Sequence, residues 1–288
     1  MIGWLDTVVQ GVLLGSLYAL FAMGLALVFG VMRLTNVAHG DLVVLAGFAA
    51  IALAAQLGLG PLGAFACLVP LAAAAGYALQ RCVLNDTLRK DPLPSLVVTF
   101  GLSIVIQNGL QEVFSADPRS LSSGALATAS VRLLEGVTVG VLPLATFCAA
   151  LLAAIALQAL FARTAAGRAF RATSDDREIA ELMGLDARVV YASATALAFV
   201  LIAGAGVLQA MRTTVAPADG PGLLIYAFEA VVIGGLGSFW GTFVGGILLG
   251  VTQAIGFRLD PGWGIWLGHV VFLAVLLVRP QGLFPRMR

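Results

Sequence analysis

Long runs of apolar residues, separated by short polar segments, dominate this sequence. Because the hydrocarbon core of a bilayer is about 30 Å thick, a helix that crosses it needs about 20 predominantly apolar residues. Runs of this kind cover residues 8–32, 42–59, 61–80, 94–111, 138–162 and 189–211. The pattern predicts a membrane-spanning helix in each of them.

The pattern is less regular in the last quarter of the chain. An apolar run over 223–233 stops at a glycine-rich break, and further runs follow over 242–257 and 265–278. The two runs beside the break are short, so they predict either a re-entrant hairpin or two tilted helices. Irregular backbone at membrane depth persists only where protein or a water-filled cavity satisfies its polar groups. Candidates for a gate or path at this break are Gly234, Gly235, Gly237 and Ser238.

Together these runs predict an all-α polytopic membrane protein with about eight to nine membrane segments in a single domain, 1–288. The composition agrees, since 60% of the 288 residues are hydrophobic and only 11% are charged. A soluble domain carries about 25% charged residues. The net charge is only +1, and we expect a lipid bilayer around the chain, with no nucleic-acid partner.

One lysine, Lys90, is present, and it follows an arginine and precedes an aspartate. A phosphate-binding P-loop requires Gly-Lys-Ser/Thr, so the chain has no Walker-type ATP site. We expect no cofactor, no metal and no catalytic residue in this chain. Three cysteines, Cys67, Cys82 and Cys148, are interpreted as small apolar core residues.

The distribution of basic residues predicts the orientation in the membrane. With the N-terminus outside, twelve Lys and Arg residues fall on the inside and four on the outside, as the positive-inside rule requires. The inside residues are Arg33, Arg81, Arg89, Lys90, Arg163, Arg168, Arg171, Arg177, Arg188, Arg279, Arg286 and Arg288. The C-terminus and the loop 163–188 are therefore expected on the cytoplasmic side.

The loop 163–188 is the longest charged stretch of the chain. It predicts a short helix over 175–183, which is too short to be stable alone in water. Its expected terminal residues are Ser174 as N-cap, Asp175 and Asp176 at the positive end of the helix dipole, and Gly184 as the stop after Met183. We expect this helix to dock on another surface.

Ile179, Leu182 and Met183 lie at positions i, i+3 and i+4, so they form one small apolar face of the expected helix. A face of this kind is typical of a helix that fits a groove on a partner. The alternative is that the helix packs back onto the chain's own spans. The missing ATP site favours docking, because a transporter without its own energy source needs a contact with one.

Asn36, His39 and Asp41 form a polar break after the first span. His39 and Asp41 are too few for a metal site, which needs three or four ligands. We interpret Asn36 and Asp41 as helix caps, with Asp41 at the start of the second span. The alternative is a gate whose irregular loop dips into the membrane.

Polar residues also recur on one side of the fourth span: Ser103, Gln107, Asn108, Gln111 and Glu112. Such residues usually face the interior of a bundle, where they join helices or line a path. Glu229 is the most deeply embedded acid, and it is expected either to pair with an arginine such as Arg212 or to line a polar route.

Two alternatives to a partner-driven transporter exist. Glu229 and Glu112 allow a self-sufficient channel or ion-coupled secondary transporter. Ser238 and His269 suggest an intramembrane hydrolase as the second alternative. The G-x-S-x-G and HExxH motifs of such enzymes are absent from the sequence. Ser238 is better interpreted as the cap of a helix that starts near Thr242.

Several segments resemble the LivH-type permeases of branched-chain amino acid ABC transporters, in that family's order and over nearly the whole chain. The most specific are Phe29-Gly-Val-Met-Arg33-Leu-Thr-Asn36-Val-Ala-His39-Gly-Asp41 and Gly234-Gly-Leu-Gly-Ser238 with Gly241. The others are 15–24, 99–103, 115–119, and the pairs 167–168, 176–177 and 183–184.

The resemblance implies a bacterial inner-membrane permease that moves branched-chain or related hydrophobic amino acids. It implies four kinds of partner surface: a homologous second permease, two cytoplasmic ATPase subunits that bind ATP and Mg, a periplasmic amino-acid-binding protein and the lipid bilayer. The segment similar to the family's ATPase-coupling loop contains Gly167, Arg168, Asp175, Asp176, Arg177, Ile179, Leu182, Met183 and Gly184. The chain departs from many relatives at Trp240 and Glu229, and related permeases also move urea, amides or aromatic amino acids, so the resemblance leaves the substrate open.

Overall fold

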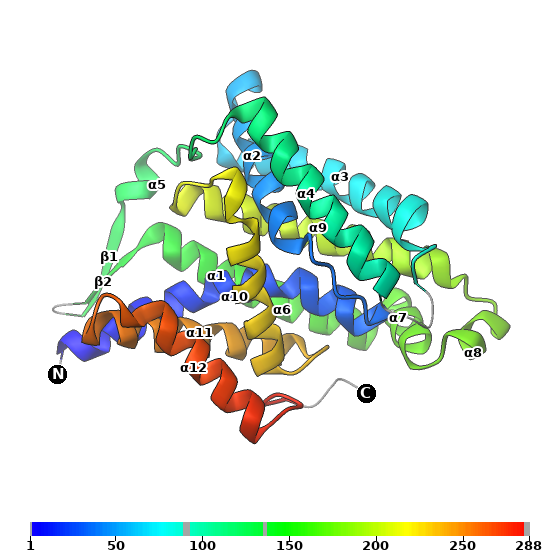
Figure 1. Ribbon diagram of the computed structural model, residues 1–288. Coiled ribbons are helices and arrows are strands. Elements are labelled where there is room, and N and C mark those ends of the chain that lie inside the picture. Colours follow the sequence, from blue (N-terminus) through cyan, green and yellow to red (C-terminus); the bar gives the residue numbers. More distant parts are fainter. Residues whose placement is uncertain (1, 89–92, 135–136, 285–288) are drawn as a thin grey trace.

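The computed structural model describes residues 2–88, 93–134 and 137–284, arranged as a bundle of helices (Figure 1). Arg89, Lys90, Arg286 and Arg288, which the orientation count includes, lie outside the described residues. The long helices are α1 Ile2–Met32, α2 His39–Leu57, α3 Pro61–Leu79, α4 Leu93–Phe114, α6 Val141–Arg163, α9 Ala187–Arg212 and α11 Phe239–Leu259. The shorter elements are η1 Gln80–Leu84, α5 Ala125–Thr128, α7 Ala165–Asp175, α8 Arg177–Leu182, η2 Pro217–Asp219, α10 Gly220–Gly234 and α12 Trp263–Val278.

Seven helices in the described part of the chain are long and apolar enough to cross a membrane. They are the long helices above, with α3 continued through the π-helical turn η1 to Leu84. The helices α10 and α12 are shorter, with 15 and 16 residues. The helical, polytopic character predicted from the apolar runs is therefore confirmed.

A small β-hairpin replaces the predicted start of one span. The strands β1 Ser130–Leu134 and β2 Val137–Gly140 pair antiparallel, so residues 138–140 are in a strand and α6 begins only at Val141. The alternating Val-Thr-Val sequence suits a half-buried strand, and β2 buries its two valines. Because residues 138–140 continue directly into the apolar run of α6, the sequence pattern assigns them to the helix.

Helix α1 is the central element of the bundle, and it packs against α11, α9, α10 and α6. Glycines bring α1 and α11 into backbone contact, because a Cβ on Gly15 would overlap the carbonyl oxygen of Gly246 and one on Gly250 would overlap the amide of Gly15. Small residues that let helix backbones approach closely are typical of membrane helix packing. The glycines that punctuate both segments in the sequence thus hold the core together.

The loops of the bundle collect at two opposite ends, which we call the hairpin end and the α8 end (Figure 1). At the hairpin end, Gln10 Nε2 donates to the Thr138 carbonyl at 3.0 Å. At the α8 end, Ser174 Oγ donates to the Gly30 carbonyl at 2.7 Å. The hairpin end and the α8 end are therefore the two parts of the bundle at which loops can contact other proteins.

The three cysteines are not core residues. Cys82 and Cys148 are exposed and Cys67 is half-buried. In a bundle surrounded by lipid, exposed positions of the spans are apolar too, so an apolar sequence context does not distinguish the core from the outer surface.

Candidate functional site

The polar break between α1 and α2 runs back into the bundle. His39, the first residue of α2, has its Nε2 2.7 Å from the carbonyl oxygen of Phe21. Phe21 lies eleven residues before the end of α1 at Met32, which corresponds to about 16 Å of helix rise. Helix α2 therefore begins beside the middle of α1, and residues 34–38 lead into the interior.

The backbone of this inward loop finds hydrogen-bond partners, as irregular backbone at membrane depth requires. Asn36 Oδ1 accepts from the amide of Ala38 at 3.0 Å, and Thr99 Oγ1 of α4 accepts from the amide of Val37 at 3.2 Å. The N-cap of α2 is Ala38, without a side-chain cap. The interpretation of Asp41 as a cap is therefore wrong, and the alternative of a gate at this loop stays a prediction.

Asp41 instead joins α2 to α4. Its side chain is buried, and Oδ1 accepts from Gln107 Nε2 at 2.9 Å, while the same amide nitrogen lies 3.3 Å from Ser103 Oγ. The start of α10 also lies here, since a Cβ on Gly40 would overlap the carbonyl oxygen of Gly220. The structure thus brings the predicted residues Asp41, Ser103 and Gln107 together where α2, α4 and α10 meet. Asn36 lies in the loop just before α2, and His39 faces α1 instead.

Asn108 does not join this polar group. Its Nδ2 donates to the Ile104 carbonyl of its own helix at 2.8 Å, and the residue is exposed, as are Gln111 and Glu112. The prediction of one polar side for α4 is therefore wrong. Successive residues of a helix are about 100° apart, so Gln107 and Asn108 cannot share a face.

A second polar cluster lies between α1, α10, α11 and α12. Glu229 Oε1 lies 2.5 Å from His269 Nδ1, and Tyr18 Oη donates to Gln253 Oε1 at 2.7 Å. The Tyr18 ring stacks on Tyr226 with centroids 4.7 Å apart. This cluster places two acid–base groups and two phenols within the span region.

The expected pairing of Glu229 with Arg212 is wrong. Arg212 Nη1 donates to the Leu13 carbonyl at 3.2 Å, and the carboxylate of Glu229 is paired with His269. No sequence pattern indicates this pair, because the residues are forty positions apart and only the packing of α10 beside α12 joins them. The one sequence feature that could have pointed to this pair is His269, a single histidine within the apolar run 265–278.

The glycine-rich break forms the tight turn between α10 and α11. Gly235 and Gly237 adopt φ of +109° and +86°, a region that side chains disfavour. Ser238 Oγ accepts from the Gly241 amide at 3.1 Å and caps α11, as predicted, although α11 begins at Phe239. The turn lies beside the end of α1, since a Cβ on Gly30 would lie 3.4 Å from the Cα of Gly237, and Ser174 of α7 bonds to the same Gly30. The amide of Phe284 donates to the Gly234 carbonyl at 3.0 Å.

The structure therefore separates the turn residues Gly234, Gly235, Gly237 and Ser238 from the polar group around Asp41. Ser238 and His269 also make different contacts, with the Gly241 amide and with Glu229. The Ser–His pairing that a hydrolase would need is not present. In the described residues, no cluster of three or more His, Cys, Asp or Glu side chains could hold a metal ion.

The charged loop forms two helices, α7 and α8, in place of the single helix over 175–183. Thr164 caps α7 by accepting from the Gly167 amide at 3.0 Å, and Gly167 packs so closely on α6 that a Cβ would overlap the Leu160 carbonyl. Asp175 is the last residue of α7. Ser174 is not an N-cap, since it lies within α7 and bonds to Gly30.

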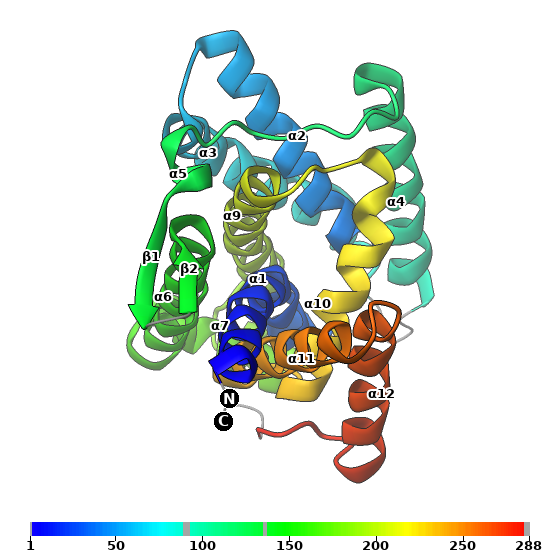
Figure 2. The same ribbon diagram turned by 90° about the vertical axis from the view of Figure 1, so that its left-hand side faces the viewer.

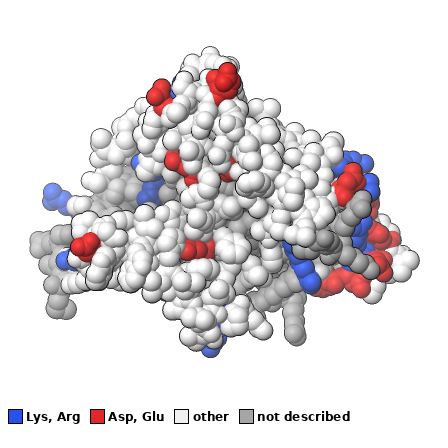
Figure 3. All heavy atoms as spheres, in the orientation of Figure 1, with Lys and Arg blue, Asp and Glu red and all other residues white. Residues whose placement is uncertain are grey.

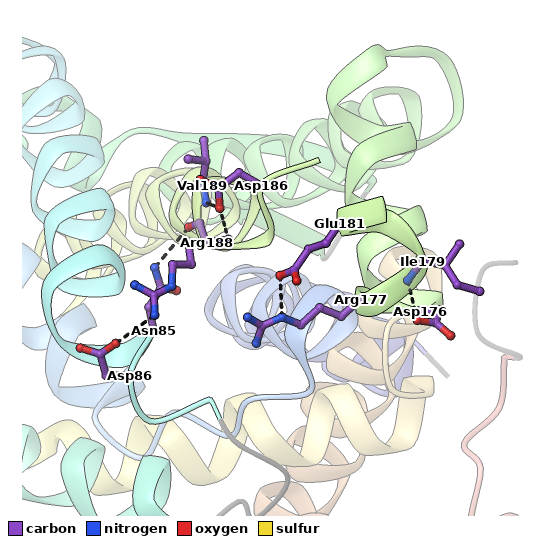
Figure 4. Close-up of polar contacts among 9 residues, drawn as sticks. All are labelled: Asn85, Asp86, Asp176, Arg177, Ile179, Glu181, Asp186, Arg188 and Val189. Atoms are coloured by element: carbon purple, nitrogen blue, oxygen red, sulfur yellow. Dashed lines mark hydrogen bonds and ion pairs between the residues drawn. The ribbon is translucent and has the colours of Figure 1, made fainter. Parts of the chain in front are cut away.

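Asp176 separates the two helices. Its backbone is extended, and its Oδ1 accepts from the Ile179 amide at 3.0 Å, which makes it the N-cap of α8 (Figure 4). Helix α8 ends at Leu182, and Met183 is its C-cap. The next residue, Gly184, has φ of +87°, and its amide donates to the Glu181 carbonyl at 3.0 Å. The predicted stop at Gly184 is confirmed, because only a glycine readily adopts this left-handed conformation.

The apolar face of α8 is exposed. The exposed fractions are 59% for Ile179, 86% for Leu182 and 79% for Met183, while Ala180 is the buried residue of this helix. The alternative that this apolar face packs back onto the chain's own spans is therefore wrong. Beside α8 lies an open hollow of about 780 Å³, whose lining includes Met32, Leu88, Tyr191 and several acids of the loop.

Charge gathers at the same end. Arg177 Nε lies 2.9 Å from Glu181 Oε1 within α8, and Arg188 Nη2 lies 3.6 Å from Asp86 Oδ1 (Figure 4). Figure 3 shows the largest cluster of visible charged side chains at this end, with smaller groups elsewhere on a mainly uncharged surface. A charged end that presents a short exposed apolar helix is suited to contact with a water-soluble partner.

The sequence matches a family profile over residues 7–279, and that family is described as the permease component of branched-chain amino acid transport systems. The chain belongs to this family.

Individual relatives support the same family assignment. The permease is 31% identical over 300 residues to the high-affinity branched-chain amino acid transport system permease protein BraD of Pseudomonas aeruginosa, with 98% of this chain and 96% of BraD covered. It is 28% identical over 305 residues to LivH of Salmonella typhimurium and 27% identical over 304 residues to LivH of Escherichia coli K12, again with 98% and 96% covered. No solved structure matches the permease. These relatives are transport permeases and not enzymes.

Proposed function

We propose that this chain is the membrane permease subunit of an ABC importer, which moves branched-chain or related hydrophobic amino acids into the cytoplasm of a bacterium. Separate ATPase subunits would bind ATP and Mg and drive alternating access. The observation that carries the proposal is the capped helix α8, whose apolar residues Ile179, Leu182 and Met183 are exposed. Exposed apolar side chains on a short helix are suited to a groove on a partner.

Helix α8 would pass the motion of the ATPase subunits to the spans through α7. Helix α7 is joined to α6 by the close approach at Gly167 and to α1 by the bond from Ser174 to Gly30. The expected coupling segment thus includes Gly167, Arg168, Asp175, Asp176, Arg177, Ile179, Leu182, Met183 and Gly184. A rigid connection of this kind is needed because a partner shifts an equilibrium only through contacts that differ between two states.

The translocation path would run past the polar group around Asp41. Helices α2 and α4 and the start of α10 meet there, and Asp41, Ser103 and Gln107 supply polar side chains. Affinity for the substrate would reside mainly in a periplasmic binding protein, so the path itself need only be weakly polar. The turn at Gly234, Gly235, Gly237 and Ser238 would act as a hinge at the α8 end.

The orientation would place the N-terminus and the β-hairpin outside and the α8 end in the cytoplasm. The grouping of the loops supports this, since Arg33 follows Met32, which lines the hollow beside α8, and Arg188 of the loop 163–188 pairs with Asp86 after α3. A periplasmic binding protein would then dock at the hairpin end, and a homologous second permease would lie alongside in the inner membrane.

Reconstitution in liposomes with the second permease, the ATPase subunits and the binding protein tests the proposal. Changing Ile179, Leu182 and Met183 to Asp should leave the permease inserted but abolish ATP-driven leucine uptake and release the ATPase subunits. Leu57→Asp is a matched control, because Leu57 is 58% exposed at the far end of α2. Normal uptake and co-purification by the triple variant would contradict the role of α8.

The alternative of an ion-coupled transporter depends on Glu229 and Glu112. The Oε2 of Glu229 is buried without a hydrogen-bond partner in the described part of the chain, whereas Glu112 is exposed. The permease alone in liposomes should show no leucine uptake under a proton or sodium gradient. Uptake by the lone chain would favour the alternative and contradict the partner-driven importer.

A further inference from the structure

A groove runs between α3 and α6, with α9 as its floor. It is partly open and has a volume of about 550 Å³. Residues of the segments 60–65, 142–153 and 200–211 line it, together with Leu20 of α1 and Leu126 of α5, and we call it the α3–α6 groove. Figure 2, in which the hairpin end faces the viewer, shows α3, α6 and α9 together on one side of the bundle, with α5 beside them.

Small residues leave this space open. Ala145, Ala149 and Ala153 line the groove from α6, and they lie four residues apart, so they share one side of that helix. On the floor, a Cβ added to Gly204 of α9 would still lie 3.6 Å from its nearest neighbour, which is the ring of Phe65. Small residues usually let membrane helices approach closely, whereas here they border a hollow that the chain itself does not fill.

The lining determines what kind of molecule can enter. Every described residue that lines the groove is glycine, alanine, proline or a larger apolar residue. The ammonium and carboxylate of a free amino acid would be buried there without partners, which is unfavourable. Hydrocarbon fits, because an unfilled hollow lacks the dispersion contacts that an apolar chain supplies. The groove is therefore suited to an apolar molecule and not to a polar solute.

The groove is about as deep as one leaflet of a bilayer. It begins at the hairpin end, since its lining includes Pro61, the first residue of α3, and Met211, the last residue but one of α9. On α6 the lining extends from Leu142 to Ala153, which corresponds to about 16 Å of helix rise. The hydrocarbon core is about 30 Å thick, so the groove ends near its middle.

This depth fits an acyl chain better than a helix of another protein. A spanning helix crosses the whole core and is about 10 Å wide, so it needs a matching face over its full length. The lining of the α3–α6 groove ends instead at Ala153 on α6 and at Val200 on α9. Helix α5 also lies at the entrance, where Leu126 contributes to the lining. An acyl chain enters from one membrane surface and ends at the midplane, as the groove does.

We propose that the α3–α6 groove binds one acyl chain of a phospholipid from the leaflet at the hairpin end. The chain lies along Ala145, Ala149 and Ala153, while the headgroup remains at the membrane surface near α5. Because α3 and α6 both pack on α9, the bound chain fills the space between three helices and stabilises their arrangement. This enclosure distinguishes the site from the lipid contact of an exposed helix face. The proposal depends on neither the direction nor the energy source of transport.

A photoreactive lipid tests the location of the site. The wild-type permease would be reconstituted with a phosphatidylethanolamine that carries a diazirine at the end of one acyl chain, extracted in mild detergent, washed and irradiated. Mass spectrometry should find adducts near the inner end of the groove, at Ala153 and Val200. Leu71 and Leu277 are controls, because they are 58% and 85% exposed but lie outside the groove. Adducts at the controls as often as in the groove, or no adduct after washing, would overturn the proposal.

A matched pair of substitutions tests whether the groove itself retains the lipid. Ala149→Phe places a ring in the groove, whereas Ala156→Phe adds the same side chain at an exposed position of α6 outside it. Native mass spectrometry of the washed protein should detect one bound phospholipid in the wild type and in Ala156→Phe, and none in Ala149→Phe. Equal retention by all three proteins, or loss in both variants, would contradict the site. The photolabelling uses the wild type, so it tests the proposal even if Ala149→Phe does not fold.

Discussion

Glu229 shows how strongly a single residue in a span depends on one neighbour. Its side chain is only 5% exposed, and His269 is its one hydrogen-bond partner among the described residues. Removing one member of a buried pair leaves an uncompensated polar or charged group, which costs more than the loss of a single hydrogen bond. The two members of this pair should therefore respond differently to substitution.

His269→Leu should lower the free energy of unfolding by about 3 kcal/mol, because it leaves the Glu229 carboxylate buried without a partner. Glu229→Gln should cost about 1 kcal/mol, since an amide can still bond to the imidazole. Thermal unfolding of the permease in detergent measures both. The double variant should be more stable than His269→Leu alone, and a His269→Leu variant as stable as the wild type would contradict the pairing.

Glycines at the start of α2 and α10 are the second feature at this scale. A Cβ on Gly40 would overlap the carbonyl oxygen of Gly220, whereas nothing lies within 4 Å of a Cβ on Gly222. We expect Gly40→Ala to destabilise the permease by about 1–3 kcal/mol through overpacking. Gly222→Ala should stabilise it by about 0.5 kcal/mol, since alanine restricts the unfolded chain. Equal melting temperatures for the two variants would contradict the close contact of α2 and α10.

At the scale of elements, the break at Asp176 turns one charged segment into two helices with separate tasks. Helix α7 buries Phe170 against Phe161, with ring centroids 5.5 Å apart, and belongs to the bundle. Helix α8 has only six residues and exposes its apolar side chains. So short a helix depends on its cap and its stop for its structure.

Asp176→Ala should therefore loosen α8. Loss of an N-cap costs about 1 kcal/mol, and hydrogen exchange at the amide of Ile179, which donates to Asp176, should become faster. Asp175→Ala is the control, because Asp175 is exposed at the end of α7 and its side chain caps no helix. Unchanged exchange in Asp176→Ala, or equal acceleration in both variants, would contradict the cap.

At the scale of the whole molecule, the ends of the bundle differ in charge and in structure. The α8 end holds α7, α8 and the largest visible cluster of charged groups, and the opposite end holds the β-hairpin (Figures 1 and 3). In a membrane, one of these ends must face the cytoplasm, and the excess of arginine favours the α8 end.

Labelling with a membrane-impermeant maleimide measures this orientation. In a background with Cys67, Cys82 and Cys148 changed to Ala, Leu182→Cys should react only after the membrane is opened, while Ala127→Cys should react in intact spheroplasts. Both positions are exposed, so accessibility to the reagent depends on the side of the membrane. The reverse pattern of labelling would contradict the proposed topology.

The sequence by itself determined the helical membrane class, the approximate spans, the capped turn at Ser238, the stop at Gly184 and the family. These follow from local features: apolar run length, glycine conformations and short motifs, each of which acts within a few residues of chain. The tertiary structure alone decided that α2 begins inside the bundle, that Asp41 bonds to Gln107 and that Glu229 pairs with His269. It also decided which exposed side of α4 is polar. These features depend on which helix packs beside which, and since lipid-facing and core-facing residues are both apolar, the apolar pattern of a membrane protein does not encode that arrangement.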